Sequence, residues 1–192
     1  MTPLDHTESA FERLIVSELT GPGGWDEGDP RSYDPQAGLY PDDALGFIVA
    51  TQSKKWDKLV ALAGGDAAAR TSLLKRLASQ LDKLGTVEVL RRGFSERGIA
   101  FSLCQLKPAH SLDEATEVAY NANRLRVVRQ VRFDPHGGDS VDLVLFVNGV
   151  PTATAELKNR WTGQNVEHAI EQYRQARDPR IVLFARRRPT PG

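Results

Sequence analysis

Two apolar runs joined by an Asn-Gly pair constrain the fold of this chain more than any other feature. They lie between Ser140 and Asn159, in the stretch SVDLVLFVNGVPTATAELKN. Asn-Gly between strand-forming residues is the strongest short-range signal for a tight β-hairpin, because both residues tolerate a positive φ angle. The first run is apolar on both faces apart from Asp142, which predicts an interior strand. A carboxylate at that position needs a partner.

The register of this hairpin decides whether its charged residues meet. Residues two apart share a face of a strand, so Glu156 and Lys158 point the same way. A plain two-residue loop at Asn148-Gly149 would put Asp142 and Glu156 on opposite faces of the sheet. A three-residue loop or one β-bulge restores a common face, and Pro151, which lacks an amide proton, favours an irregular register. The two acids therefore share a face only if the hairpin contains one extra residue.

Two carboxylates and an ammonium group on one patch would have a specific chemistry. Two nearby anions repel each other unless a cation lies between them. Oxygen ligands without His or Cys suit Mg²⁺ or Mn²⁺ rather than zinc. Such a cation can polarise a phosphate oxygen and activate water, while a lysine orients that water or screens charge. The alternative is the solvated face of an ordinary hairpin, and the spacing of Asp142, Glu156 and Lys158 alone does not decide between the two.

The pattern along the chain predicts helices first and a mixed sheet afterwards. Helical spacing and capping residues dominate up to residue 93, and alternating patterns with turn signals follow. We therefore expect one α/β (mixed α+β) domain over residues 1–192, with helices flanking a central mixed sheet. The expected parts are a first helix at 7–20, a helical insertion at 42–93, a sheet core with the hairpin at 98–185, and a basic, Pro-containing tail at 186–192.

Individual strands and helices of the sheet core follow from the same patterns. The expected strands are GIAFSLCQLKP (98–108), LRVVRQVRF (125–133), the two hairpin runs and RIVLFA (180–185). The expected helices are SLDEATEVAYNANR (111–124) and NVEHAIEQYRQAR (165–177). Between the first helix and the insertion, a Gly- and Pro-rich stretch is expected to be a loop.

Composition narrows the class of protein. No apolar stretch approaches the roughly 18 residues needed to cross a bilayer, and the first residues lack a signal sequence. A single Cys104 excludes an internal disulfide and a cysteine-built metal site, which fits the reducing cytoplasm. The formal net charge is zero, but residues 51–100 hold ten bases against five acids, so the neutral total does not exclude a nucleic-acid partner. We expect a cytoplasmic protein that is not membrane-bound.

The hairpin and its flanking segments resemble the amino-terminal nuclease domain of the R (restriction) subunit of type I restriction enzymes, in the PD-(D/E)xK nuclease superfamily. The matching segments are LRRGFSERGIAF, ANRLRVVRQVRF, the hairpin stretch itself and TGQNVEHAIEQYRQARDPR. The likeness runs from about Thr7 to Phe184. It implies a PD-(D/E)xK nuclease-like core with a helical insertion after the first helix.

The resemblance also implies roles for individual residues. Asp142 is similar to the family's metal-binding aspartate, Glu156 to its second metal-binding carboxylate, and Lys158 to its catalytic lysine. The family tends to use a further acid from the first helix. Glu8 is the better candidate, since its helical angle falls on the apolar stripe, whereas Glu12 falls at the margin. An acid favoured by the helix dipole is the alternative for Glu8.

Other candidate residues surround this set. Many relatives carry Gln-x-x-x-Tyr on the helix after the lysine, but here Gln172 and Tyr173 are adjacent, so they are candidates for contacts near the site or for simple packing. On the strand at 125–133, Arg126 shares its parity with Arg124 and Arg132. These arginines are predicted to form either a basic row for a DNA backbone or an exposed, charged strand face.

The function implied by the resemblance is a Mg²⁺-dependent (or Mn²⁺-dependent) endonuclease domain that hydrolyses DNA phosphodiester bonds in a type I restriction-modification system. Double-stranded DNA and the modification and specificity subunits are the implied partners. The chain contains no GxxxxGK[ST] phosphate-binding motif, so neither an ATP site nor a motor domain is expected in it. The alternative is a catalytically silent, truncated R-subunit fragment that binds DNA or docks to the modification and specificity subunits.

Overall fold

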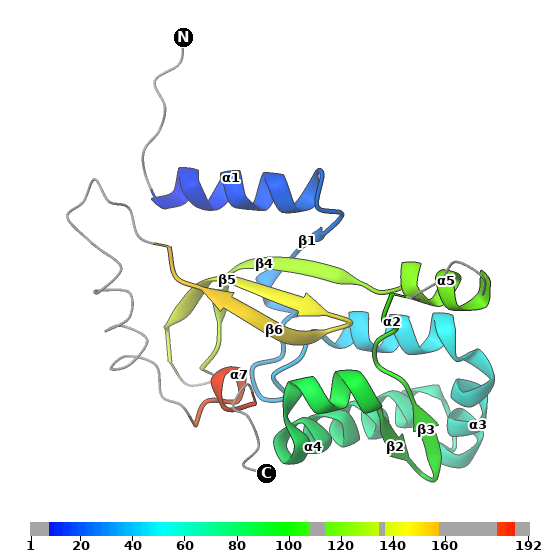
Figure 1. Ribbon diagram of the computed structural model, residues 1–192. Helices are drawn as coiled ribbons and strands as arrows, with labels where there is room; N and C mark the ends of the chain where they lie inside the picture. The colour runs from blue at the N-terminus through cyan, green and yellow to red at the C-terminus, as the bar shows by residue number, and fades with distance from the viewer. Residues whose placement is uncertain (1–7, 108–113, 135–136, 158–179, 187–192) are drawn as a thin grey trace.

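The structure is a computed structural model that describes residues 8–107, 114–134, 137–157 and 180–186. Its centre is a four-stranded mixed sheet with the order β1-β4-β5-β6 (Figure 1). The strands are β1 (Asp26–Gly28), β4 (Leu125–Arg132), β5 (Ser140–Val147) and β6 (Val150–Ala155). β1 runs parallel to β4, and the other neighbours are antiparallel. The predicted mixed α+β class with a central mixed sheet is confirmed.

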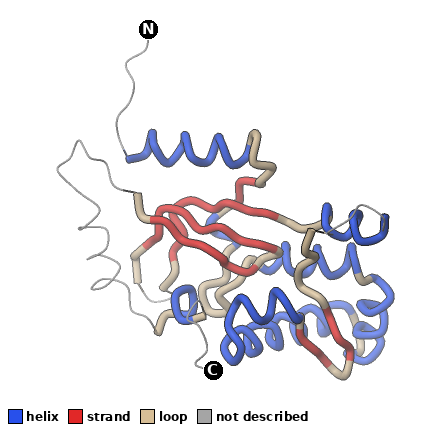
Figure 2. Tube along the Cα trace, viewed as in Figure 1, coloured by secondary structure: helices blue, strands red, loops and turns tan. Residues whose placement is uncertain are grey.

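Helices cover both faces of this sheet (Figures 1 and 2). One face carries α1 (Glu8–Thr20), and the other carries the helical layer of α2 (Pro41–Thr51), α3 (Ser53–Ala63) and α4 (Asp66–Arg92). The smaller elements are the 3₁₀ helix η1 (Pro30–Ser32), the hairpin of β2 (Phe94–Glu96) and β3 (Ile99–Phe101), α5 (Glu114–Asn121) and α7 (Val182–Ala185). α4 contains a kink at Gly85, where φ is 78°.

Three apolar clusters hold these layers together. The cluster between α1 and the sheet contains Val16, Val127, Leu143 and Leu157. The cluster on the opposite face of the sheet contains Tyr33, Tyr40, Val128, Val131, Phe133, Val141, Val144, Phe146 and Leu183. A third cluster fills the helical layer, where Leu73, Leu77 and Leu81 recur at a spacing of four residues and are fully buried. Burial of each such side chain stabilises the fold by about 1.5–3 kcal/mol.

Two predicted strands differ from the structure. RIVLFA was predicted as a last strand, but Val182–Ala185 form the short helix α7. A short apolar run satisfies either pattern, and here Leu183 is buried against the sheet face instead of pairing at its edge. The predicted strand GIAFSLCQLKP contributes only β3, which pairs with β2 in a separate hairpin. The loop predicted before the insertion supplies β1.

The turn of the β5–β6 hairpin is anchored on both sides. Asn148 and Gly149 have φ angles of 46° and 76°, as a type I′ turn requires. The carbonyl of Gly149 accepts a 2.8 Å hydrogen bond from the backbone N–H of Tyr40, at the start of α2. The buried Asn148 side chain accepts from the Arg124 backbone N–H at 2.7 Å and donates to the Leu103 carbonyl at 2.9 Å. The hairpin turn predicted at Asn148-Gly149 is thus present, with two residues, and is fixed to the helical layer.

Candidate functional site

A β-bulge in β6 sets the register of the two candidate carboxylates. Near the turn, Phe146 pairs with Pro151, but Leu145 pairs with Ala153, so Thr152 is the extra residue. The ladder then continues in the shifted register to its last pair, Leu143 with Ala155. The next positions in this register are Asp142 and Glu156. Of the two irregularities that the sequence allowed, a three-residue loop or a bulge, the structure contains the bulge.

A second irregularity turns Asp142 towards α1. Gln130 in β4 has a φ of 51°, a left-handed conformation that is uncommon for a residue other than glycine. Strand alternation is interrupted at this level: Leu143 packs in the cluster under α1, whereas Val141, two residues earlier, packs on the opposite face. The interruption allows the side chains of Asp142 and Gln130 to meet on the α1 side of the sheet.

Both oxygens of the Asp142 carboxylate are engaged. Oδ2 accepts a 2.6 Å hydrogen bond from the backbone N–H of Leu157, the residue after Glu156. Oδ1 accepts a 3.3 Å hydrogen bond from Nε2 of Gln130. These contacts tie the end of β6 to the middle of the sheet. The Leu157 N–H and the Gln130 amide are thus the partners that a carboxylate in an interior strand was expected to need.

Glu12 on α1 completes the described part of the site. Its side chain is buried, and its Oε2 accepts a 2.9 Å hydrogen bond from the same Nε2 of Gln130. Its other oxygen lies 3.8 Å from Nε of Arg129. Sequence reasoning placed Glu12 at the margin of the apolar stripe and preferred Glu8. Glu8 begins α1, but its side chain lies outside the described part of the chain, so its predicted role stays a prediction.

The remaining predicted residues lie partly within and partly beyond the described ranges. Glu156 is described and is half-buried at the end of β6. Lys158, Gln172 and Tyr173 fall outside the described residues, so their predicted roles are not tested by the structure.

Arg124, just before β4, and Arg126, within it, do not form the basic row that was one of the two predicted arrangements. Arg126 makes two hydrogen bonds to the carboxylate of Asp43, at 2.5 and 2.9 Å, and only 16% of its side chain is exposed. Arg124 lies 3.6 Å from the same carboxylate. The hydrogen bonds that Arg126 donates to the Asp43 carboxylate raise the pKa of its guanidinium above its ordinary value. Arg132 also does not share a face with Arg124 and Arg126, because the interruption at Gln130 shifts the alternation of side chains by one residue.

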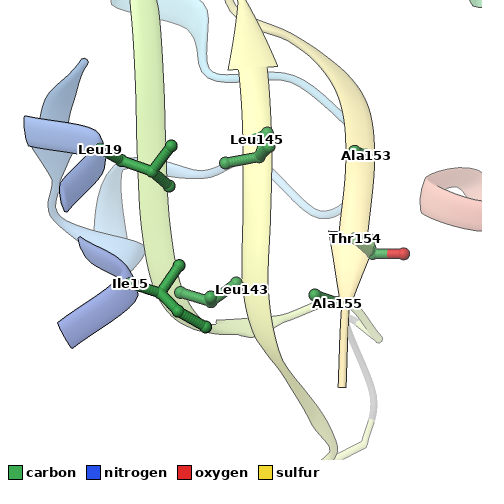
Figure 3. Close-up of a pocket in the computed structure, with 7 residues that line it drawn as sticks. All are labelled: Ile15, Leu19, Leu143, Leu145, Ala153, Thr154 and Ala155. Carbon is green, nitrogen blue, oxygen red and sulfur yellow. The ribbon is translucent and has the colours of Figure 1, made fainter. Parts of the chain in front are cut away.

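An apolar pocket of about 130 Å³ borders the site between α1 and the sheet. Figure 3 shows Ile15 and Leu19 of α1 beside Leu143 and Leu145 of β5 in this pocket. The remaining lining is Ala153, Thr154 and Ala155 of β6. Such a lining suits the packing of apolar groups, and a charged phosphate would lose its hydration there without compensation.

The comparison with known protein families identifies the family of this chain. The family model described as the type I restriction enzyme R protein N terminus matches residues 42–185. The chain belongs to this family. No curated protein and no solved structure matches it. The predicted resemblance to the R subunit of type I restriction enzymes is thus confirmed at the level of the family.

The family segment covers most of the site in this R protein N-terminal chain. Asp142 and Glu156 lie within the matched residues, as does Gln130, whereas α1 with Glu12 precedes them. Within the described residues of this family member, no helix is long and apolar enough to cross a membrane.

The described donor set fits a hard divalent cation in its chemistry. Within the described part of this R protein N-terminal chain, no three His, Cys, Asp or Glu side chains are grouped as a ready metal site. The described donors are instead the carboxylates of Glu12 and Asp142, each with one oxygen within 3.3 Å of a single amide nitrogen. Mg²⁺ is commonly held by one or two carboxylates together with water. Two carboxylates that face a common point meet that requirement.

Proposed function

We propose that this R protein N-terminal domain is a PD-(D/E)xK nuclease that hydrolyses DNA phosphodiester bonds with Mg²⁺ or Mn²⁺. The observation that carries the proposal is the shared Gln130 amide, whose Nε2 donates to the carboxylates of both Glu12 and Asp142 on the α1 side of the sheet. Membership of a restriction enzyme family supports DNA as the substrate. Double-stranded DNA and the modification and specificity subunits of a type I complex are the proposed partners.

In this proposal Asp142 and Glu156 hold the cation, and Glu12 supplies a further carboxylate from α1. When bound, the cation supplies Lewis-acid polarisation of a phosphate oxygen and a more acidic water. Lys158 follows Glu156 by two residues, and its ammonium group would orient the attacking water or screen charge that develops on the phosphate. Asp142 also fixes the backbone of Leu157, which holds this segment against the sheet.

A polar groove beside Glu12 supports a path for the DNA backbone. It is lined by Arg13, Val16, Ser17 and Thr20 of α1 together with Glu27 and Arg129. The Arg129 side chain is 39% exposed and makes a 2.8 Å ion pair with Glu27. A partly exposed guanidinium next to the carboxylate site can exchange an exposed carboxylate partner for a phosphate. Contacts of this kind position the backbone and carry no sequence information, which leaves target choice to a specificity subunit.

A catalytically silent DNA-binding or docking domain is the second candidate function. The observation that favours it is that both oxygens of Asp142 already accept hydrogen bonds, one from the Leu157 N–H and one from Gln130 Nε2. A purely structural carboxylate would show the same contacts. The two candidates differ in what they predict for plasmid DNA.

The deciding experiment incubates the purified chain with supercoiled plasmid in Mg²⁺, Mn²⁺ or EDTA. A Lys158→Ala variant is run beside Lys83→Ala, which removes an exposed lysine on α4 and serves as the matched control. Nicking that requires the metal, is lost in Lys158→Ala and persists in Lys83→Ala supports the nuclease. Plasmid that shifts in mobility but stays intact in every lane supports the silent domain.

A further inference from the structure

The side chain of Gln130 occupies the point that the Glu12 and Asp142 carboxylates share. Its Nε2 donates to Glu12 Oε2 at 2.9 Å and to Asp142 Oδ1 at 3.3 Å. Its Oε1 accepts a 3.0 Å hydrogen bond from the Ser140 hydroxyl. Because carboxylates accept and the hydroxyl donates here, these contacts fix which end of the amide faces the acids. A neutral group with two N–H donors therefore lies between two anions.

The backbone of Gln130 is strained to put the amide there. A φ of 51° within a strand is unfavourable for any residue that carries a Cβ, and ladder pairs continue on both sides of Gln130. The irregularity is what brings Gln130 and Asp142 to the α1 side of the sheet. Strain of this kind persists only where the surrounding contacts compensate for it, and the compensating contacts here are those to the two carboxylates.

We propose that the Gln130 amide takes the place of the divalent cation in the metal-free protein and gives way when the cation binds. The inference rests on the nuclease function proposed above. Without a cation, Glu12 and Asp142 would repel each other across a partly buried gap, and the amide relieves that repulsion. A divalent cation relieves it more strongly, so the bound state no longer needs the amide. Gln130 is thus a positioning residue that competes with the metal.

The test measures Mn²⁺ affinity directly, by electron paramagnetic resonance of free Mn²⁺, in variants that keep the left-handed backbone. Gln130→Asn shortens the side chain so that it no longer spans both carboxylates, and Gln130→Gly removes it; both residues tolerate positive φ. We expect both variants to bind Mn²⁺ about tenfold more tightly, because binding no longer breaks hydrogen bonds to charged groups. Ser140→Ala, which removes the anchor of Oε1, should give a smaller increase.

A second measurement separates this role from simple structural support. Without metal, the thermal midpoints of Gln130→Asn and Gln130→Gly should fall below that of the wild type, and saturating Mn²⁺ should restore most of the difference. Unchanged or weaker Mn²⁺ binding in both Gln130 variants, or a deficit that Mn²⁺ leaves in place, overturns the inference but not the nuclease proposal. If the wild type itself fails to bind Mn²⁺, both proposals fall. Should both Gln130 variants fail to fold, Ser140→Ala decides by whether its affinity rises.

Discussion

Asp142 Oδ2 lies 2.6 Å from the backbone nitrogen of Leu157, so a candidate metal ligand also fastens the segment that follows β6. Leu157 is buried in the cluster under α1, where an unpaired N–H would be costly. The same carboxylate therefore has a structural task and a proposed chemical one. The two tasks respond differently to substitution.

Asp142→Asn and Asp142→Ala separate these tasks. Both variants should lose Mn²⁺ binding, because both remove the negative charge. Asp142→Ala should also lower the free energy of unfolding by about 1–3 kcal/mol, since the Leu157 N–H loses its acceptor, whereas Asp142→Asn retains an acceptor oxygen. Urea denaturation and Mn²⁺ titration measure the two effects. Wild-type Mn²⁺ affinity in Asp142→Asn would show that this carboxylate holds no metal.

The bulge residue Thr152 offers a test of register that leaves every charged residue in place. Deleting Thr152 removes the extra residue of β6 and shifts Glu156 by one position relative to Asp142 on the neighbouring strand. We expect the deletion variant to lose Mn²⁺ binding. The control is Thr152→Ala, which keeps the chain length and loses only the 3.1 Å hydrogen bond from Oγ1 to the Leu145 carbonyl. That control should cost about 1 kcal/mol of stability and should bind Mn²⁺ normally. Normal binding after the deletion would contradict the proposed pairing.

Glu12→Gln and Glu8→Gln compare the two acids at the start of α1. The buried Glu12 shares the Gln130 amide with Asp142, so its conversion to a neutral amide should weaken Mn²⁺ binding at least tenfold (about 1.4 kcal/mol). We expect a smaller loss for Glu8→Gln, which lies one helical turn further from Val16 and the cluster under α1. Calorimetric titration with Mn²⁺ ranks the two variants. The reverse order would restore the role that the sequence assigned to Glu8.

The sequence predicted the hairpin and the need for one extra residue, in a longer loop or in a bulge, because both follow from strictly local rules. Asn148-Gly149 determines the turn, and the parity of Asp142 and Glu156 determines how many residues must lie between them. The left-handed conformation of Gln130 has no such signal, since glutamine carries no preference for positive φ. Without that interruption, nothing in the sequence links Glu12 to Asp142.

Long-range contacts account for the other differences. Strand parity alone made Arg126 a candidate for DNA contact, yet its partner Asp43 lies on α2, far away in the chain. Only the packing of α2 on the sheet brings the two together. The run 180–185 was ambiguous for a related reason: Leu183 is buried in either a strand or a helix, and the place of α7 on the sheet face is decided by tertiary contacts.

Arg126→Gln and Arg124→Gln test the same carboxylate from two sides. Asp43 is 1% exposed, and Arg126 forms its two close hydrogen bonds. Removing Arg126 leaves a buried charge poorly compensated and should lower the free energy of unfolding by about 3–5 kcal/mol. Arg124 is 42% exposed and lies 3.6 Å from Asp43, so its removal should cost about 1 kcal/mol or less. Equal losses in urea denaturation would mean that the two arginines share the charge evenly.

Gly149→Ala and Gly64→Ala distinguish backbone strain from a steric clash at the hairpin turn. Both glycines have positive φ, 76° and 84°, so an alanine at either position costs about 1–2 kcal/mol for its left-handed conformation. A Cβ at Gly64 meets nothing within 4 Å, whereas a Cβ at Gly149 would collide with the carbonyl oxygen of Tyr40 and with α2. We therefore expect Gly149→Ala to lose clearly more stability in urea denaturation than Gly64→Ala. Because the displaced turn carries β5 and β6 with it, Gly149→Ala should also weaken Mn²⁺ binding, and Gly64→Ala should leave it unchanged. Equal losses of stability in the two variants would show that the turn moves freely away from α2, and the helical layer would then have no part in holding the hairpin.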